Sequence, residues 1–255
     1  MARIVLVHGI LGFGDLFPLQ PKFYFNGIKP LYERAGHEVF CPNLAALGSV
    51  DLRSASLIEQ IAGFLRSDNQ PIYLLAHSMG GLDCRRMLVS RPDIAAKVER
   101  LITVATPHAG SPVANEVLKP GLFGVLNPAR VLTRFFGDEF GAVQDLTTYN
   151  VPQDPDVGGV DYQCVGCDGG PPHRSPLFSV TADYGGFGAT RNDGVVSLAS
   201  ASRTKNAAHL DVVWPVDHGE AIGWPSSPEA GRQALSVPPP VHIARYQALL
   251  ERLVR

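Results

Sequence analysis

Charged residues are scarce in this sequence, and neither sign dominates. Asp, Glu, Lys and Arg make up 18% of the 255 residues, and the formal net charge is −2. A chain without an excess of basic residues has no positive electrostatic field to attract phosphate groups. The sequence also has no zinc-finger spacing and no interleaving of basic and aromatic residues, so we expect no nucleic-acid partner. No apolar run is long enough to cross a bilayer, so any membrane contact would be peripheral.

The first residues lack the parts of a secretory leader. The stretch MARIVLVHG enters an apolar, strand-like run at its fourth residue, which leaves no room for a basic segment, an apolar segment and a cleavage site. As the sequence stands, we expect a cytoplasmic protein, or a secreted one if a leader has been removed. Nothing in the sequence indicates an oligomeric state.

Cysteine is also rare, and of the four in the chain only Cys164 and Cys167 lie close together. A redox C-x-x-C should open a helix, and a zinc site needs a second pair of ligands. This pair instead ends an apolar, strand-like run and leads into glycine and proline. We therefore expect neither redox nor metal chemistry at these cysteines.

Through the first 110 residues, short apolar runs alternate with helical patterns. Strands are expected at 3–9, 37–44, 71–78 and 98–107, and helices at 27–36, 54–68 and 80–92. In the first of these helices we expect Leu31 and Ala35 to share a face, and in the second Leu57, Ile61, Phe64 and Leu65. The alternation predicts an α/β fold, a mostly parallel sheet with helices on both faces, in one domain over residues 1–255.

From about 111 to 160 the pattern changes. Prolines and glycines interrupt helical fragments that are more apolar than a solvent-exposed loop should be. Their apolar residues include Leu122, Phe123, Phe135 and Phe136. This segment is either an ordinary packed helix pair or a cap over an apolar cleft. Strand-like runs follow at 159–167, at 176–184 and just after Asp193, and 240–255 has the period of a helix. That helix carries Ile243, Tyr246, Leu249, Leu250 and Leu253 on one face.

The stretch LLAHSMGG, residues 74–81, has the order of a nucleophile elbow, which is a strand, a tight turn and a helix. Small residues at Ala76 and Gly80 let the turn tighten, and Ser78 then points out of the sheet edge. The helix that follows supplies the Met79 N–H to a developing oxyanion. A second donor should come from VHGILGFG, residues 7–14, and we assign it to the Ile10 N–H.

A reactive serine needs a histidine base oriented by a carboxylate, and in this fold the chain order is Ser, acid, His. Asp193, in the turn of TRNDGVVS, is the expected acid. Two histidines follow it. His218 ends an apolar run in a loop, where it could reach Ser78, whereas His209 lies in a polar stretch and is expected at the surface or in packing.

Four other residues are candidates for these roles. Asp217 adjoins His218, but consecutive residues rarely face each other well enough to orient an imidazole, and Asp183 is the alternative acid. His77 is expected to fill space or to contact an acyl chain, and His108 to make a local hydrogen bond. Neither of these histidines has the downstream position that the chain order requires.

Taken in order, VLVHGILGFGD, FNGIKPLYERAGHEVF, AHSMGGLDCRRM, VATPHAGSPVA, NDGVVS and DHGEAIG resemble the bacterial triacylglycerol lipases of pseudomonad type, within the α/β-hydrolase superfamily. The resemblance covers most of the chain and is weakest between about 115 and 185. It implies a helical lid at 111–160. It also implies the same site: nucleophile Ser78, acid Asp193, base His218, and oxyanion donors Ile10 and Met79.

The sequence departs from these lipases at three places besides the missing leader. Many of them hold a calcium ion near the catalytic histidine, and here Glu220 matches the acid ligand while Trp224 stands where a side-chain amide is needed. We expect no cofactor, with Glu220 as the remaining calcium candidate. No cysteine lies near Asp193 to brace the acid loop with a disulfide. The shorter insertion leaves room for an esterase or polyester hydrolase.

We therefore expect a serine carboxylic-ester hydrolase that acts on small-molecule or lipid esters through an acyl-enzyme. An acyltransferase or a thioesterase could use the same three residues. A noncatalytic binding module on the same scaffold is the alternative from a different class of protein.

Overall fold

The computed structural model describes residues 1–10, 24–65, 70–119, 141–170, 174–202, 210–224 and 240–255. Within these residues six strands form one parallel sheet in the order β2-β1-β3-β4-β5-β6. The strands are β1 (Arg3–Val7), β2 (Glu38–Phe40), β3 (Ile72–His77), β4 (Val98–Val104), β5 (Asp161–Cys167) and β6 (Val212–Trp214). The predicted α/β fold with a parallel sheet is confirmed.

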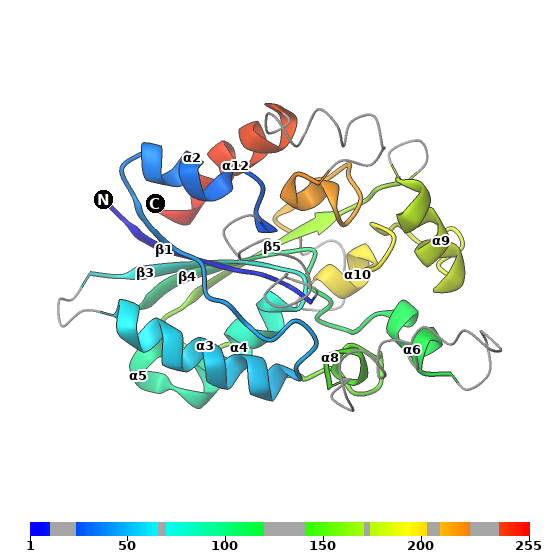
Figure 1. Cartoon of the computed structure of the whole chain (residues 1–255), viewed down its shortest axis with the longest axis horizontal. Helices are drawn as coiled ribbons and strands as arrows, with labels where there is room; N and C mark the ends of the chain where they lie inside the picture. Colours follow the sequence, from blue (N-terminus) through cyan, green and yellow to red (C-terminus); the bar gives the residue numbers. More distant parts are fainter. Residues whose placement is uncertain (11–23, 66–69, 120–140, 171–173, 203–209, 225–239) are drawn as a thin grey trace.

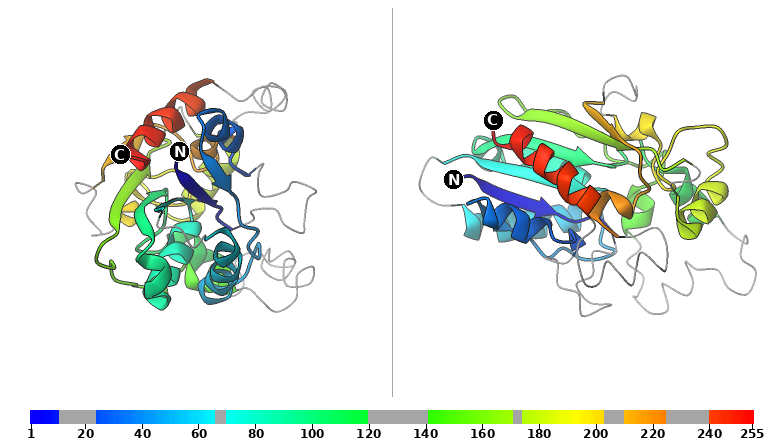
Figure 2. Two further views of the ribbon diagram at one scale, coloured as in Figure 1. Left: turned by 90° about the vertical axis from the view of Figure 1, so that its left-hand side faces the viewer. Right: turned by 90° about the horizontal axis from the view of Figure 1, so that it is seen from above.

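Helices cover both faces of the sheet (Figure 1). On one face lie α2 (Ile28–Arg34) and the carboxyl-terminal α12 (Pro240–Leu253). On the other lie α3 (Val50–Phe64), α4 (Gly80–Ser90) and the short α5 (Pro92–Ala95). The two termini lie at the same end of the molecule, opposite the carboxyl ends of the strands (Figures 1 and 2).

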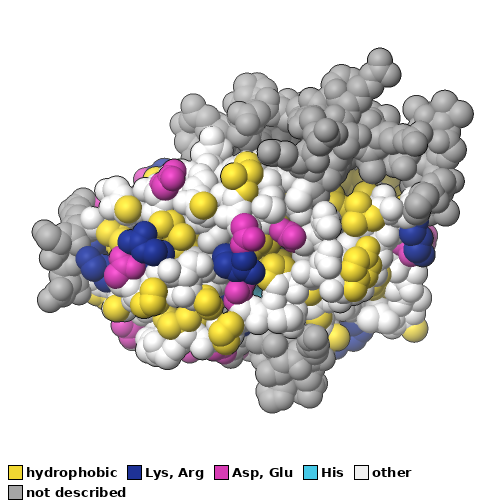
Figure 3. All heavy atoms as spheres, turned by 90° about the horizontal axis from the view of Figure 1, so that it is seen from below, with side chains coloured by type: hydrophobic (Ala, Val, Ile, Leu, Met, Phe, Trp, Pro, Cys, Tyr) yellow, Lys and Arg dark blue, Asp and Glu magenta, His cyan; other side chains and the backbone are white. Residues whose placement is uncertain are grey.

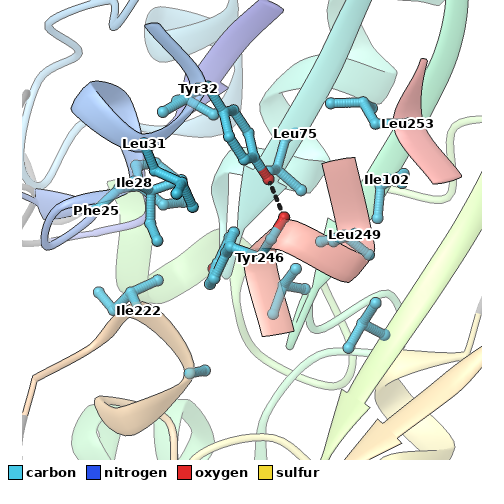
Figure 4. Close-up of a cluster of buried hydrophobic side chains, with 14 of the residues drawn as sticks. Phe25, Ile28, Leu31, Tyr32, Leu75, Ile102, Ile222, Tyr246, Leu249 and Leu253 are labelled. Atoms are coloured by element: carbon cyan, nitrogen blue, oxygen red, sulfur yellow. Dashed lines mark hydrogen bonds between the residues drawn. The ribbon is translucent and has the colours of Figure 1, made fainter. Parts of the chain in front are cut away.

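The central strands explain why both faces need a cover. Every residue of β1 and of β3 is buried, so alternate side chains of each strand enter two different cores. One core lies under α2 and α12, and there the Tyr32 hydroxyl donates a 3.0 Å hydrogen bond to the Tyr246 carbonyl (Figure 4). The other lies under α3, α4 and α5, around Leu57 and Met87.

The terminal helix follows its predicted face, since Tyr246, Leu249 and Leu253 are buried in the first core. In α2 the prediction was wrong for Ala35. The helix ends at Arg34, Ala35 is its exposed cap, and Tyr32 is buried beside Leu31. In α3, Leu57 and Ile61 are buried as predicted, while Phe64 and Leu65 are only half-buried at its end.

On the face covered by α3, α4 and α5, basic side chains lie next to acidic ones (Figure 3). Arg85 pairs with Asp156, and Arg86 lies between Asp51 and Asp154. Apolar side chains lie between and beside these pairs (Figure 3).

Two segments that were predicted as strands do not form strands. Residues 176–184 form α9 (Pro176–Tyr184), and the run after Asp193 is irregular up to Ser197, where it leads into α10 (Leu198–Ala201). Both helices start with a serine cap: the hydroxyl of Ser175 accepts from the Phe178 N–H, and that of Ser197 accepts from the Ser200 N–H. A serine cap satisfies a backbone donor at the helix start, and this local signal overrides β-branched composition.

Within the predicted insertion the structure describes α6 (Pro112–Leu118) and α8 (Gly141–Asp145), which lie beyond the carboxyl ends of the strands together with α9 and α10 (Figure 1). The apolar residues between them, 122–136, lie outside the described residues, so the cap and the extent of the domain stay predictions. None of the helices in the described part of the chain is long and apolar enough to span a membrane.

Candidate active site

Ser78 occupies the turn between β3 and α4 in a strained backbone conformation. Its φ is 55°, in the left-handed region that non-glycine residues rarely adopt. The turn is held from the neighbouring strand: the Ser78 N–H donates to the Val104 carbonyl at 2.9 Å, and the Ser78 carbonyl accepts from the Thr106 hydroxyl at 2.8 Å. Such strain persists only where the surroundings fix it, and it recurs at functional sites.

The glycines after Ser78 let α4 start tightly against the sheet. A Cβ on Gly80 would lie 2.5 Å from the Val7 carbonyl oxygen, and one on Gly81 would lie 2.3 Å from the Thr106 hydroxyl oxygen. The start of α4 therefore lies directly on the end of β1. Ala76, at the first small position of the elbow, is fully buried in β3.

The structure brings together the three residues that were predicted as nucleophile, base and acid. His218 Nδ1 lies 2.7 Å from Asp193 Oδ2, and His218 Nε2 lies 3.0 Å from Ser78 Oγ. A carboxylate only accepts, so Nδ1 carries the ring proton. Nε2 is then the acceptor for the Ser78 hydroxyl, which is the tautomer that a general base needs.

Asp193 is buried, and both of its carboxylate oxygens are used. Oδ1 accepts from the N–H groups of Val195 at 2.9 Å and Val196 at 2.7 Å, and Oδ2 faces His218. The main chain adds a second link, because the His218 N–H donates to the Asp193 carbonyl at 3.0 Å. This turn fixes the carboxylate and the imidazole as one unit.

The other acids weighed for that role lie elsewhere. Asp217 acts as a cap: it accepts from the N–H groups of Ser175, Gly219 and Glu220. Asp183 is exposed on α9. His108 makes the expected local hydrogen bond, 3.2 Å from its Nε2 to the Thr103 hydroxyl.

His209 lies outside the described residues. His77 is buried directly before Ser78, and its ring lies 4.6 Å from that of His218, centroid to centroid.

His8 shapes the segment that carries the second predicted oxyanion donor. The Leu44 N–H donates to His8 Nε2 at 3.0 Å, so the proton of the neutral ring is on Nδ1, which donates to the Gly9 carbonyl at 2.8 Å. Burial, and then the charge of Arg53, lower the pKa of His8 to about 3, so the ring is neutral. In a trans peptide the C=O and the next N–H point in opposite directions. Holding the Gly9 carbonyl therefore aims the Ile10 N–H.

Gly9 itself touches the nucleophile, because a Cβ there would lie 2.7 Å from Ser78 Cβ. Ile10 is half-buried and packs against a cluster that includes Met79 and Leu82. The two predicted oxyanion donors, Ile10 and Met79, thus come from neighbouring segments beside Ser78, one after β1 and one at the start of α4.

Sequence reasoning missed Arg53, which is fully buried. It donates to Asp83 Oδ2 at 2.9 Å, to the Ala45 carbonyl at 2.7 Å and to the His8 carbonyl at 2.6 Å. Arg53 lies on α3, Asp83 on α4 and His8 after β1, and no local pattern links the three. The guanidinium thus ties the loop after β1 to α3 and α4.

Around His218, Asp217 and Trp224 are engaged in contacts of their own, and the expectation of no calcium at Glu220 stays a prediction. Calcium takes about 6–8 oxygen ligands. The oxygens of Asp217 are already used by N–H groups, and Trp224 Nε1 donates to the Tyr24 carbonyl at 2.9 Å instead of presenting an oxygen. Among the described residues no group of three or more His, Cys, Asp or Glu is arranged to hold a metal.

The cysteines are thiols in the structure. Cys164 and Cys167 lie on β5 rather than at a helix start, and burial raises the pKa of Cys167 well above its usual range. A buried thiol of this kind is a poor nucleophile.

Comparison with known proteins finds lipases and esterases among the proteins similar to this chain. A family profile described as a PGAP1-like alpha/beta domain matches residues 54–132. The chain is 32% identical over 136 residues to a triacylglycerol lipase of Pseudomonas fragi, covering 52% of this chain and 44% of that one. It is 28% identical over 214 residues to triacylglycerol lipase 2 of Saccharomyces cerevisiae, covering 79% and 62%. The chain thus spans 44% to 62% of the length of these curated relatives.

Two solved structures share the fold over nearly the whole chain. The Staphylococcus hyicus lipase has a TM-score of 0.69 at 14% identity, covering 98% of this chain and 94% of that one. A metagenomic carboxyl esterase has a TM-score of 0.68 at 19% identity, covering 98% and 76%. The expected resemblance is confirmed: the chain has an α/β-hydrolase fold and is a relative of the triacylglycerol lipases.

Proposed function

We propose that the protein is a serine carboxylic-ester hydrolase that works through an acyl-enzyme. The observation that carries this proposal is the continuous hydrogen-bonded chain from Ser78 Oγ through the His218 ring to Asp193. A buried serine in a strained turn, with a histidine at 3.0 Å whose tautomer leaves Nε2 free to accept, is arranged for proton removal and nucleophilic attack.

In the first half of the reaction, Ser78 Oγ attacks the ester carbonyl carbon and its proton passes to His218 Nε2. The carbonyl oxygen becomes an oxyanion and accepts from the Ile10 and Met79 N–H groups. When the carbon–oxygen bond to the alcohol breaks, His218 returns the proton to the leaving oxygen, and the acyl group stays on Ser78.

In the second half, water attacks the acyl carbon and gives its proton to His218. The tetrahedral intermediate collapses, the Ser78 oxygen leaves and recovers that proton, and the carboxylic acid departs. Asp193 holds Nδ1 throughout and stabilises the imidazolium.

For the substrate class we propose esters with an apolar acyl chain. Phe178 on α9 lies against His218, with ring centroids 6.1 Å apart, and on the same helix Leu177 and Val180 are each 66% exposed. Large apolar side chains left exposed beside a reactive site suit contact with an acyl chain or with a lipid surface. The lipase names of the curated relatives support the same substrate class.

The test is hydrolysis of p-nitrophenyl esters together with labelling by a fluorophosphonate, which reacts with an activated serine. We expect wild type to do both and Ser78→Ala to do neither, with a loss of at least about 10³-fold in kcat. Ser78→Ala at the wild-type rate would end the proposal. Wild type that neither labels nor hydrolyses would favour a binding module. Long-chain esters are expected to be better substrates than acetate, and product partition with an added alcohol separates a hydrolase from an acyltransferase.

A further inference from the structure

Tyr24 lies next to the elbow, although 53 residues separate it from His77. Its hydroxyl and His77 Nδ1 share a hydrogen bond of 2.7 Å, and both side chains are buried. The same hydroxyl borders the nucleophile: a Cβ on Gly9 would lie 2.9 Å from it and 3.1 Å from Ser78 Oγ. Tyr24 therefore belongs to the wall of the site without forming part of the Ser78, His218 and Asp193 chain.

The main chain around Tyr24 is bonded to the loop that carries His218. The Tyr24 carbonyl accepts from Trp224 Nε1, the Asn26 N–H donates to the Ile222 carbonyl at 3.1 Å, and Asn26 Nδ2 donates to the Gly223 carbonyl at 2.8 Å. The Tyr24 ring also packs edge-on against Phe25, with centroids 5.3 Å apart. These contacts hold the Tyr24 ring in place independently of its hydroxyl.

The His77 ring contacts both the Tyr24 hydroxyl and the ring of the base His218, so the position of Tyr24 affects that of His218. Its ring is tilted by 48° against the ring of His218, and Phe178 contacts His218 as a second neighbouring ring. Asp193 restrains Nδ1 of His218, but the 3.0 Å approach of Nε2 to Ser78 also depends on how far the ring leans toward the serine. Because His77 directly precedes Ser78 in the chain, the contact between the His77 and His218 rings fixes the tilt of the His218 ring relative to Ser78.

The His77 ring must be neutral, because it lies next to a base that becomes positively charged during the reaction. His218 gains a proton in each half of the proposed reaction, and a cation 4.6 Å away would oppose that step. Burial and the neighbouring His218 lower the pKa of His77 well below its usual range, so His77 stays neutral. Burial likewise raises the pKa of Tyr24 and keeps its hydroxyl protonated.

We propose that Tyr24 and His77 are a positioning pair for His218, in which the Tyr24 hydroxyl fixes the His77 ring and the His77 ring holds the His218 imidazole at bonding distance from Ser78. This inference rests on the proposed ester hydrolysis. It assigns no contact with substrate to either residue, and it accounts for a buried polar pair that the reaction steps do not use.

The first test removes one hydroxyl from each of two buried tyrosines. Tyr24→Phe deletes the bond to His77, and the control Tyr32→Phe deletes the bond to the Tyr246 carbonyl in the core under α2 and α12 (Figure 4). Active enzyme is counted by fluorophosphonate titration, so kcat refers to folded, reactive protein only. We expect Tyr24→Phe to lose about three- to tenfold in kcat with KM changed by less than about twofold, and Tyr32→Phe to keep the wild-type kcat.

The second test is a double-mutant cycle with His77→Ala. If the hydroxyl acts through His77, adding Tyr24→Phe to His77→Ala causes no further loss of kcat. The proposal is overturned if Tyr24→Phe keeps the wild-type kcat, if Tyr32→Phe loses as much, or if the two losses multiply. Should His77→Ala fail to fold, the comparison of Tyr24→Phe with Tyr32→Phe decides alone. Wild type that neither labels nor hydrolyses would instead refute the ester hydrolysis itself.

Discussion

Replacing Arg53 by methionine should lower the melting temperature (Tm) of the protein considerably. Arg53 and Asp83 have no exposed side-chain surface, and Arg53 Nη2 lies 2.8 Å from Asp83 Oδ2. Removing one partner of a buried pair leaves an uncompensated charge and costs about 3–5 kcal/mol. For a chain of this size each kcal/mol lowers Tm by about 2–4 °C, so we expect Arg53→Met to lower Tm by roughly 6–20 °C in a thermal melt.

The loss should depend on pH in a defined direction. Burial raises the pKa of Asp83 from 3.8 to about 6, against the opposing charge of Arg53. Without Arg53 the folded-state pKa rises further. A carboxyl group whose pKa is raised by folding is protonated more readily in the folded state, so it costs stability as pH rises from about 4 through its folded pKa. The difference in Tm between Arg53→Met and wild type should therefore be larger at pH 8 than at pH 5.

A double variant separates stability from activity. Arg53→Met with Asp83→Leu removes both charges, and we expect it to recover at least half of the lost Tm, because buried pairs replaced by apolar side chains are often neutral. It still lacks the bond from Arg53 to the His8 carbonyl, which holds the loop of the predicted donor Ile10. Its kcat on a p-nitrophenyl ester should stay at least about tenfold below wild type. A Tm loss under about 3 °C in Arg53→Met, or a wild-type kcat in the double variant, would refute this reasoning.

Three further expectations follow from the site. Asp193→Ala should lower kcat by about 10³-fold or more. Asp217→Ala leaves three N–H groups without an acceptor, so its main effect should be a lower Tm, with a smaller loss of kcat than in Asp193→Ala. A larger loss of kcat in Asp217→Ala than in Asp193→Ala would exchange the roles of the two acids. Gly81→Ala should destabilise the fold by about 1–3 kcal/mol in denaturant titration, because its Cβ would lie 2.3 Å from the Thr106 hydroxyl oxygen and 2.7 Å from the Thr106 methyl carbon. Combination with Thr106→Ser, which removes only the methyl group, should recover part of that loss. Hydrolysis should be indifferent to a calcium chelator; a loss of rate that added calcium restores would contradict the expectation of no cofactor and favour Glu220 as a calcium ligand.

The elements predicted best are those whose signal is local. The strand, turn and helix around Ser78 could be predicted from a few adjacent residues, because a short continuous apolar run followed by small residues indicates such a turn directly. Asp193 and His218 were assigned from chain order, and the turn at Asp193 is itself local, since Oδ1 bonds to residues two and three positions later.

The errors show where composition is a weak guide. PLFSVTADY was predicted as a strand because of its aromatic and β-branched residues, yet it forms α9 with Leu177 and Val180 facing outward. A helix whose large apolar residues are exposed has no amphipathic pattern to detect, and only the Ser175 and Pro176 start signal indicates it. The links made by Arg53 and Tyr24 join segments that lie 30 and 53 residues apart, and no periodicity encodes such contacts.

The sheet order explains why contacts from several distant segments gather around His218. Ser78 follows the central strand β3, whereas His218 follows the edge strand β6, with β4 and β5 between them. At about 4.8 Å per strand, the base starts roughly 14 Å from the nucleophile and must be carried back across the ends of two strands. A loop making that crossing has no ladder to fix it, so its position comes from side contacts. Asp193 holds it from the β5 side, Asp217 caps its turn, and Tyr24 with His77 contacts it from the β1 side. Because the Tyr24 hydroxyl reaches His218 through the His77 ring, its loss changes the reach of His218 before it changes the fold, and we expect losses in kcat without matching losses in Tm at the Tyr24 and His77 pair.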